Sequence, residues 1–255
     1  MKINILYRHY YNSDLEVNGK NQYATVFNNV VTGESWSEPF RPSWFNYERC
    51  FRNLLHTIKG KNVELHLIMD GNIDDGFMKK YKDYFTLHTI QAGSDQKSFN
   101  KTWEIANSLD TKDDELFYFL ENDYVHVDHW VENTIDVFKT NPGLMHYVSL
   151  YDHNDKYIHE DYMNLVSKVY CFPKQHWRST PSTCGSFIIS KQLLKADIDV
   201  HTSFDGDHEK FLHLGEKRGR AILTPLPSLS THSVRSLEAP IIDWESIISQ
   251  SDKEL

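Results

Sequence analysis

The sequence predicts a single α/β domain with a mostly parallel central sheet flanked by helices. Its 255 residues, of which 40% are hydrophobic, are sufficient for one full hydrophobic core. In the first half of the chain, short apolar runs rich in strand formers alternate with segments whose apolar residues recur every three or four positions. Strands and helices in that order form parallel sheets with right-handed crossovers. The apolar run 117–120 ends in Glu121, Asn122 and Asp123, which places two carboxylates where open α/β sheets bind ligands.

The N-terminal part of the chain is expected to contain a first strand, a long excursion and a helix. Residues 2–8 have the composition of a buried strand, and a polar, aromatic turn follows them. Residues 13–41 are rich in Asn, Gly and Ser and show little periodicity, so we expect an excursion with a short hairpin around 23–31. Pro42 suits the first turn of a helix, and the apolar residues after it recur at helical spacing as far as Ile58.

The middle of the chain continues the alternation of strands and helices. Gly93 and Ser94 precede an amphipathic segment, and the residues at 141–143, Asn-Pro-Gly, are typical of a helix end. The expected elements are a strand at 63–69, a short helix at 74–83, a strand at 85–90, a helix around 99–106, the strand that ends at Glu121 and a helix at 127–138.

The pattern changes in the second half of the chain. Residues 176–183 are too polar for a core strand, and we interpret them as a binding loop carried by the buried strand that follows. The acidic segment 205–209 predicts the start of a helix that ends near Gly215, and no strong helix is expected between Val234 and residue 241. The expected strands are 145–150, 166–172, 185–189 and 221–223.

Composition and charge argue against several classes of protein. The net charge of −9 makes extensive nucleic-acid binding unexpected, because phosphate contacts need clustered Lys and Arg. No apolar run approaches the ~20 residues that span a bilayer. Residues 1–6 are too short an apolar run for a signal peptide, so we expect a cytoplasmic protein without a membrane anchor. Cys50, Cys171 and Cys184 lack metal-ligand spacing and are expected to be buried thiols.

Binding groups are expected at the ends of strands, because the sequence contains neither the glycine motif of dinucleotide-binding proteins nor a Walker lysine loop. Arg8 and Tyr10 follow the first strand and can hold a nucleobase by hydrogen bonding and stacking. Glu121 and Asp123 point the same way because strand side chains alternate. Their oxygens suit Mg²⁺ or Mn²⁺, with diphosphate oxygens completing the coordination. A strand that ends in a solvated acidic turn would explain the same residues without a ligand.

Five short motifs stand in an order that is typical of one family. They are Asp70 after the second expected strand, Gly93-Ser94 before a helix, Glu121-Asn122-Asp123 as a variant of the Asp-x-Asp motif, the acidic helix start at Asp207, and His232. From residue 2 to about residue 235, the chain thus resembles GT-A glycosyltransferases of the family 2 type. The segment 176–183 and the residues around His232 and Trp244 also resemble a bacterial and phage subgroup of unknown substrate.

The resemblance implies a nucleotide-binding half at 1–123, an acceptor half at 124–232 and a C-terminal tail at 233–255. Asp123 and His232 would hold Mn²⁺ or Mg²⁺ on the donor diphosphate, although Glu-Asn-Asp in place of Asp-x-Asp leaves open whether Glu121 contacts the metal. The residues implied in nucleotide-sugar binding are Arg8, Tyr10, Asp70, Ser94, Asn100, Glu121, Asn122, Arg178, Thr183 and Arg235.

The same resemblance implies a general base at the start of the helix that follows residue 204. Asp207 is the expected base, with Asp205 and Glu209 as the alternatives. The base would take the proton of an acceptor hydroxyl as that hydroxyl attacks the anomeric carbon of the sugar. Arg178 and Arg235 would stabilise the charge of the departing diphosphate.

These expectations together describe a metal-dependent, inverting glycosyltransferase. Its donor is expected to be a UDP-sugar, and its acceptor a hydroxyl group of a glycan or of a hydroxymethylated base in phage DNA. One alternative is a protein that binds nucleotide sugars without transferring them. Another is a metal-dependent nucleotidyltransferase, which would usually carry a glycine-rich, basic loop after its first strand.

Overall fold

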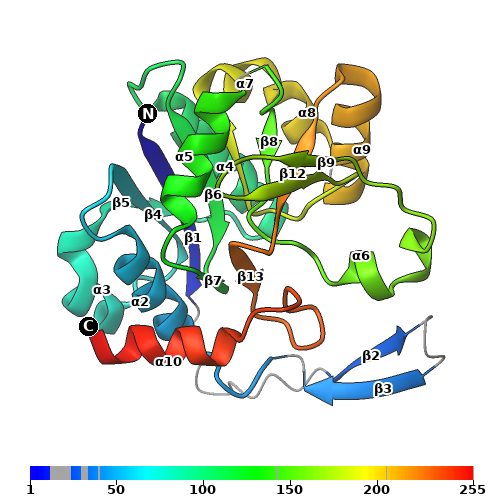
Figure 1. Ribbon diagram of the computed structural model, residues 1–255. Coiled ribbons are helices and arrows are strands. Elements are labelled where there is room, and N and C mark those ends of the chain that lie inside the picture. Colours follow the sequence, from blue (N-terminus) through cyan, green and yellow to red (C-terminus); the bar gives the residue numbers. More distant parts are fainter. Residues whose placement is uncertain (12–23, 30–33, 40, 142, 205, 255) are drawn as a thin grey trace.

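A computed structural model describes residues 1–11, 24–29, 34–39, 41–141, 143–204 and 206–254, and it has the single α/β domain that the sequence predicts (Figure 1). Nine strands of these residues form the main sheet, in the order β5-β4-β1-β6-β11-β8-β12-β10-β9. Only β11 and β10 run against the other seven. The strands are β1 (Ile3–Tyr11), β4 (Val63–Gly71), β5 (Thr86–Ile90), β6 (Leu116–Glu121), β8 (Tyr147–Val148), β9 (Val169–Cys171), β10 (His176–Ser179), β11 (Phe187–Ser190) and β12 (Ile222–Leu226).

Two small sheets accompany the main one in the described residues. The strands β7 (Tyr124–His126) and β13 (Ser230–His232) pair antiparallel, as do β2 (Ala24–Asn29) and β3 (Glu34–Pro39). The second pair forms the hairpin expected around 23–31, and it extends further along the chain than expected. The first pair matters for function, because it brings the end of β6 next to a segment about a hundred residues later.

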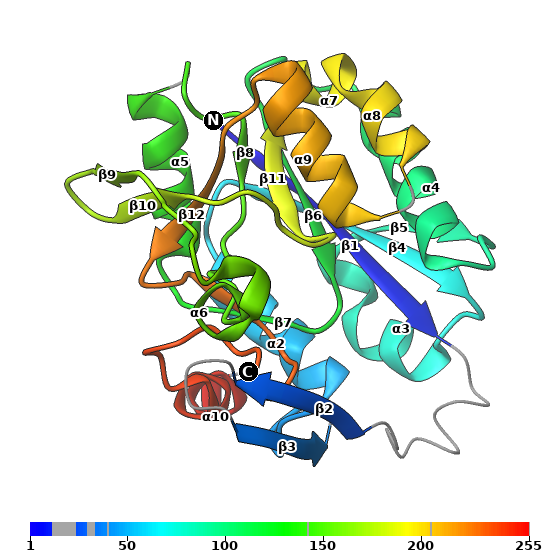
Figure 2. The same cartoon turned by 90° about the vertical axis from the view of Figure 1, so that its right-hand side faces the viewer.

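Helices cover both faces of the main sheet (Figure 2). One face packs on α2, α5 and α10, and the other on α4, α7, α8 and α9. Strand β1 shows why both faces are apolar, because Ile5 and Tyr7 belong to the first core and Leu6 to the second. The helices are α2 (Tyr47–Ile58), α3 (Asp75–Tyr81), α4 (Asp95–Ser108), α5 (Trp130–Thr140), α6 (Asp155–Ile158), α7 (Lys191–Ala196), α8 (Ile198–Ser203), α9 (Asp207–Arg218) and α10 (Trp244–Glu254), with 3₁₀ turns η1 (Lys82–Tyr84) and η2 (Glu160–Tyr162).

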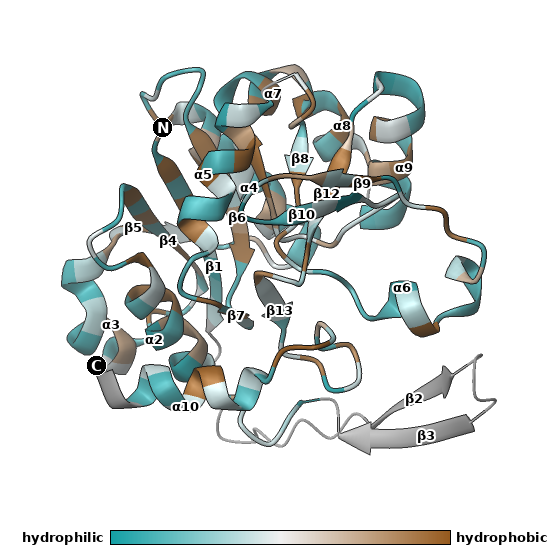
Figure 3. Ribbon diagram, in the orientation of Figure 1, coloured by the Kyte–Doolittle hydropathy of each residue, from teal (hydrophilic) through white to brown (hydrophobic). Residues whose placement is uncertain are grey.

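Hydropathy follows this layering. In Figure 3 the central strands are mostly hydrophobic, while the outer surfaces of the helices are hydrophilic. Among the described residues no helix is both long enough and apolar enough to cross a membrane.

Several expected boundaries were wrong, for local reasons. The first long helix begins at Tyr47 and not at Pro42, because the side chain of Asn46 caps it by accepting from the backbone of Glu48 and Arg49. Helix α9 continues past the expected end near Gly215 and stops only where Gly219 adopts a left-handed conformation with φ 63°.

The second half of the sheet also differs from expectation. Residues 176–183 were expected to form a polar loop, but β10 pairs with both β12 and β9 inside the main sheet. Its polar residues are tolerated because Arg178 is buried against Asp152. The strands expected at 145–150 and 166–172 shrink to β8 and β9. Cys171 on β9 is exposed, so the expectation of three buried thiols was wrong for this residue.

Candidate functional site

Arg8, within β1, pairs with Glu121, the last residue of the neighbouring strand β6. Strand β1 continues to Tyr11, so the turn expected directly after residue 8 was wrong. Arg8 and Glu121 lie opposite each other in the parallel register of β1 and β6. The Nη2 atom of Arg8 donates to Glu121 Oε1 at 3.0 Å, and its Nη1 atom donates to Asp95 Oδ1 at 2.8 Å. Ser186, just before β11, donates to the second oxygen of Glu121 at 3.2 Å. Both carboxylate oxygens of Glu121 are therefore hydrogen-bonded within the protein.

Asp123 lies between a guanidinium group and an imidazole group that come from distant parts of the chain. The Nη2 atom of Arg41 is 2.8 Å from Asp123 Oδ2, and the Nε2 atom of His232 is 3.0 Å from the same oxygen. The pairing of β7 with β13 sets His232 opposite Tyr124, and the two rings stack with centroids 5.0 Å apart. The small sheet thus fixes the position of the His232 imidazole beside Asp123.

The charges at this edge shift one another's pKa. Burial tends to raise the pKa of Asp123, but His232 and Arg41 outweigh it and lower that pKa. Burial tends to lower the pKa of His232, but Asp123 outweighs it and the pKa is raised. For Glu121, burial and the charge of Asp123 raise the pKa while Arg8 opposes them, and the net shift is upward. Asp123 is therefore the carboxylate that the site holds ionised most firmly.

A small cavity of about 110 Å³ opens at this edge of the sheet. A Cβ atom at position 185 would lie only 3.0 Å from Arg8 Nη2 and 3.3 Å from Glu121 Oε1. A side chain at this position would therefore press on the Arg8–Glu121 pair, and glycine avoids this crowding. The cavity is lined by Arg8, Tyr10, Asp95, Ser98, Glu121, Asn122 and Asp123.

One oxygen of Asp123 has the character of a ligand atom. Its Oδ1 is buried and lacks a hydrogen-bond partner among the described residues, although Oδ2 has two. A buried, unsatisfied carboxylate oxygen is costly unless something binds it. No group of three His, Cys, Asp or Glu side chains that could hold a metal occurs in the described part of the chain. The donor set therefore fits a hard cation only if ligand oxygens, such as those of a diphosphate, complete the coordination.

Helix α9 brings Asp207 close to this edge. Lys210, one turn later, is only 1% exposed, and its Nζ atom donates to Asp207 Oδ1 at 3.0 Å. The same Nζ lies 4.6 Å from the ring centroid of Phe99, and the guanidinium of Arg8 lies 5.5 Å from that ring. Burial tends to lower the pKa of Arg8, but Glu121, Asp95 and Asp207 raise it, so the charge of Asp207 reaches the cavity.

The two alternatives for the general base are placed differently. Asp205 lies outside the described residues. The carboxylate of Glu209 folds back over Gly206, where a Cβ atom would be 2.1 Å from Glu209 Oε2. That position lies beside the first turn of α9, whose exposed N–H groups and dipole favour a negative charge.

Three of the predicted donor-binding residues make local bonds near the same edge. Asp70, at the end of β4, accepts from the backbone N–H of Ala92 at 2.9 Å. Ser94 caps the N-terminus of α4, and Asn100 accepts from the Gln96 amide at 2.9 Å. Other residues line the cavity, so a ligand that reached these three would extend beyond it.

Arg178, Thr183 and Arg235 are not brought to this cavity. Arg178 lines a second and larger pocket and donates through Nε to Asp152 Oδ1 at 3.1 Å. Thr183 is buried and donates to Ser149 Oγ at 2.8 Å. Arg235 is exposed and follows β13.

Sequence reasoning missed Arg41, Asp95 and Lys210. Arg41 follows an aperiodic segment, so no pattern in the sequence marks it as a site residue. Asp95 stands at a helix start, where the helix dipole alone explains an acidic residue. Lys210 follows Asp207 by three positions on a predicted helix. That spacing places the two side chains on one face, and it was the one available clue.

Comparison with known proteins supports the fold and goes no further. No family model matches the chain, and no curated protein matches it. The solved structure of CMP:2-keto-3-deoxy-manno-octonic acid synthetase in complex with CTP aligns over 100% of both chains, with a TM-score of 0.51 and 13% identity. TarS 1–349 of S. aureus aligns over 88% of this chain and 58% of its own, with a TM-score of 0.45 and 11% identity. A cytidylyltransferase from Leptospira borgpetersenii aligns over 87% of this chain and 74% of its own, with a TM-score of 0.43 and 13% identity.

The full-length alignment is the one that supports an inference, and at 13% identity the inference concerns the fold. The chain has a GT-A-like fold, which it shares with this synthetase. This fold hosts transfer of sugars and transfer of nucleotides, so the site must distinguish between them. Membership in the family 2 type, and in its bacterial and phage subgroup, stays a prediction.

Proposed function

We propose that this protein is a glycosyltransferase that moves a sugar from a nucleotide sugar, preferably a UDP-sugar, to a hydroxyl acceptor. The observation that carries the proposal is the buried Oδ1 atom of Asp123, which lacks a hydrogen-bond partner among the described residues. It lies at the carboxyl edge of the sheet, on a cavity bordered by cationic Arg8 and close to His232. An acidic ligand atom among cations suits a metal–diphosphate group better than a free anion or a free cation.

Asp123 and His232 are the residues that would hold Mn²⁺ or Mg²⁺ in this proposal. A carboxylate oxygen and an imidazole nitrogen suit Mn²⁺ in particular. The bound cation would supply positive charge to the donor diphosphate. Glu121 is a weaker candidate ligand, because both of its oxygens already accept hydrogen bonds from Arg8 and Ser186.

The protein's own residues would perform the rest of the reaction. The guanidinium groups of Arg8 and Arg41 pair with carboxylates in the structure. In this proposal, diphosphate oxygens would take over part of these hydrogen bonds as negative charge collects on the diphosphate and its bond to the sugar breaks. Asp207 would accept the proton of the acceptor hydroxyl while the new bond to the anomeric carbon forms. One displacement of this kind inverts the anomeric configuration and releases the nucleoside diphosphate. Lys210 would keep the Asp207 carboxylate in place.

The acceptor is more consistent with a glycan than with DNA. A net charge of −9 opposes binding to a polyanion, because it raises the electrostatic cost of approach. A hydroxymethylated base of phage DNA stays the less favoured acceptor.

A nucleotidyltransferase is the second candidate, because the structure that aligns over its full length is a CMP-sugar synthetase bound to CTP. In that reaction, an attack on the α-phosphate of CTP would release pyrophosphate. In the proposed sugar transfer, UDP leaves and pyrophosphate is never formed. The products therefore separate the two functions.

The test follows the phosphorus-containing products by ³¹P NMR in the presence of Mg²⁺, because paramagnetic Mn²⁺ would broaden the phosphate resonances. One set of reactions contains UDP-glucose, UDP-galactose or UDP-N-acetylglucosamine with and without glycan acceptors, and another contains CTP with 2-keto-3-deoxy-manno-octonic acid. Release of UDP without pyrophosphate supports the proposed function. Release of pyrophosphate from CTP overturns it in favour of the second candidate, and tight UDP binding without turnover favours a binding protein.

A further inference from the structure

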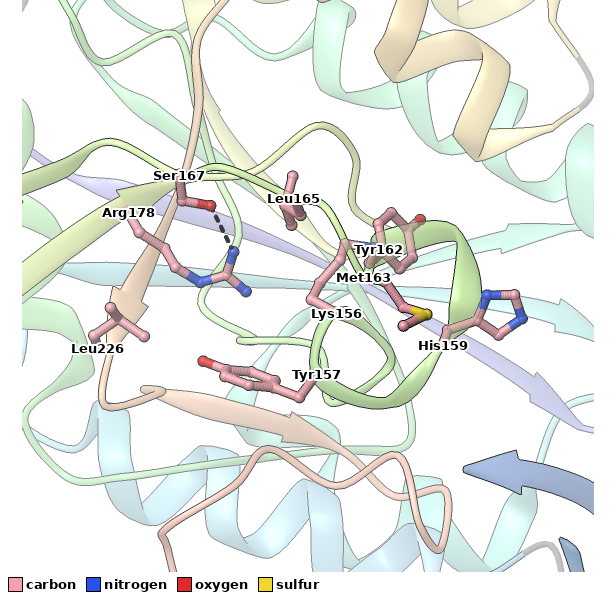
Figure 4. A pocket seen from close by; sticks show the side chains of 9 residues that line it. All are labelled: Lys156, Tyr157, His159, Tyr162, Met163, Leu165, Ser167, Arg178 and Leu226. Atoms are coloured by element: carbon pink, nitrogen blue, oxygen red, sulfur yellow. Dashed lines mark hydrogen bonds between the residues drawn. The ribbon is translucent and has the colours of Figure 1, made fainter. Parts of the chain in front are cut away.

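A pocket that lies apart from the candidate active site is bordered by residues of α6 and η2 (Figure 4). Its volume is about 520 Å³, which is in the range of small-molecule sites. Arg178 reaches into it from β10 and Tyr157 from α6. The lining residues are Lys156, Tyr157, His159, Tyr162, Met163, Leu165, Ser167, Arg178 and Leu226.

The cations in the wall of this pocket are already neutralised by partners. Arg178 donates through Nη2 to Asp152 Oδ1 at 2.5 Å, and the hydroxyl of Tyr157 donates to the other oxygen of Asp152 at 2.6 Å. The ammonium group of Lys156, whose side chain is 3% exposed, lies 3.1 Å from Asp155 Oδ2. A strong electrostatic preference for an anionic ligand is therefore not expected in this pocket.

The pocket instead offers aromatic and aliphatic surface with hydroxyl groups at its edge. Tyr162 stands over the Lys156 ammonium, which lies 3.9 Å from the ring centroid. Tyr157 is 47% exposed and Met163 is 66% exposed, so part of this surface is open to solvent. A sugar ring has C–H groups that pack on tyrosine faces, and hydroxyls that exchange hydrogen bonds with groups such as Ser167.

We propose that this pocket binds a neutral saccharide unit. If the proposed function holds, the unit belongs to the glycan acceptor, and this part of the inference rests on that function. Contacts in this pocket, remote from the donor, would anchor the acceptor glycan and help to position its reacting end. Binding energy from remote groups supports catalysis in this way.

A series of side-chain contacts, through the partly buried His153 and Cys184, leads from the pocket towards the candidate active site. His153 follows Asp152 in the chain, and its Nε2 atom lies 3.2 Å from Thr183 Oγ1 and 3.9 Å from Cys184 Sγ. Cys184 in turn lies 2.7 Å from the hydroxyl of Tyr124, the residue that stacks on His232. These contacts connect Asp152 beside the pocket with His232 beside Asp123, although the two cavities have no lining residue in common.

The methionines give a direct test on the whole 255-residue chain. The chain has five, and Met163 is the one that lines the pocket. With methyl-¹³C methionine, added maltose should move the Met163 resonance in a saturable way and leave the other four in place. A Met163→Leu variant assigns the signal. Tyr162→Ala should abolish the movement, and the control Tyr84→Ala, at a tyrosine that is 56% exposed on η1, should retain it.

If none of the five methionine resonances of the parent moves up to the solubility limit of maltose, the inference is overturned, and this outcome requires no assignment and no variant. Movement with glucose 1-phosphate but not with maltose also overturns it, because the pocket would then select an anion. The titration contains no nucleotide, so its outcome is separate from that of the ³¹P NMR experiment. Failure of the transferase proposal would leave a positive maltose result standing as a saccharide site without an assigned reaction.

Discussion

Asp123 is the residue at which the charges of the candidate site meet. Its Oδ2 atom contacts both Arg41 and His232, whereas its buried Oδ1 atom has no hydrogen-bond partner among the described residues. This asymmetry cannot be seen in the sequence, because Arg41 is 82 positions before Asp123 and His232 is 109 positions after it. The acidic end of the strand predicted that Asp123 belongs to a binding site, but its partners are known only from the fold.

Asp207 should be the residue on which proton transfer depends. Asp207→Asn should reduce the rate of sugar transfer by a factor of about 10² to 10⁴, because a general base typically contributes that much. UDP affinity should hold, since Asp207 does not line the cavity. Rates of UDP release measured with saturating donor check the first expectation, and calorimetry checks the second.

The matched control for this variant is Glu209→Gln, two positions further along α9. Its transfer rate should remain near that of the parent, because Glu209 folds over Gly206 at the helix start. A dead Glu209→Gln beside an active Asp207→Asn would move the base to Glu209. Thermal unfolding of both variants must accompany the rates, because Asp207→Asn leaves the buried ammonium of Lys210 without its carboxylate.

Among the secondary-structure elements, β10 shows where sequence patterns fail. Its sequence, His-Trp-Arg-Ser, lacks the apolar character of a core strand, yet Trp177 and Arg178 are both buried. Burial of Arg178 is possible because Asp152, 26 positions earlier, accepts two hydrogen bonds from it. Pairwise compensation of this kind depends on tertiary contacts, which no local window of sequence contains.

Helix α10 should be part of the core and not a dispensable tail. It packs on α2, and Trp244 is 3% exposed with its indole N–H donating to Ala239 O at 2.9 Å. Trp244→Ala should therefore lower the free energy of unfolding by roughly 3–5 kcal/mol. Gln250→Ala, on the exposed side of the same helix, should change it by less than about 0.5 kcal/mol. Chemical denaturation measures both, and equal small effects would contradict this view of α10.

At the scale of the whole molecule, the first half of the fold was predictable and much of the second half was not. The strands β1, β4, β5 and β6 and the helices between them show strong periodicity and obey the rules of parallel sheets, so their presence and parallel arrangement followed from the sequence. Beyond residue 145 the strands are short, β11 and β10 are antiparallel, and α6, α7 and α8 have only four to six residues each. Such short elements lack a measurable period, and tertiary packing decides them.

Stability should fall in mild acid because the fold buries neutral histidines. Burial lowers the pKa of His9 to about 4, with the charge of Asp74 opposing the shift only weakly. Below pH ~6.5 the unfolded chain binds a proton at this histidine that the folded chain does not bind. His9 therefore does not lower the free energy of unfolding above that pH. As the pH falls from ~6.5 towards 4, it lowers this free energy by up to ~3 kcal/mol.

His9→Phe should flatten this part of the pH profile. The ring of His9 stacks on Phe77 with centroids 4.9 Å apart, so phenylalanine keeps the packing and removes the titration. Urea denaturation of the parent and the variant between pH 7 and pH 4 gives the difference. The exposed control His208→Gln should lose as much stability between pH 7 and pH 4 as the parent does. An equal loss in His9→Phe and in the parent would contradict the assignment to His9.

The most direct test of the account is calorimetric titration of UDP with and without Mn²⁺, on the parent, on Asp123→Asn and on a control at an exposed carboxylate, Asp110→Asn. Asp123→Asn keeps the size of the side chain and an oxygen that can accept from Arg41, so the variant should fold. We predict that Mn²⁺ tightens UDP binding to the parent and to Asp110→Asn by at least about tenfold, or ~1.4 kcal/mol, and that Asp123→Asn loses this gain. Equal Mn²⁺-dependent UDP binding in Asp123→Asn and in the parent would contradict the proposed site.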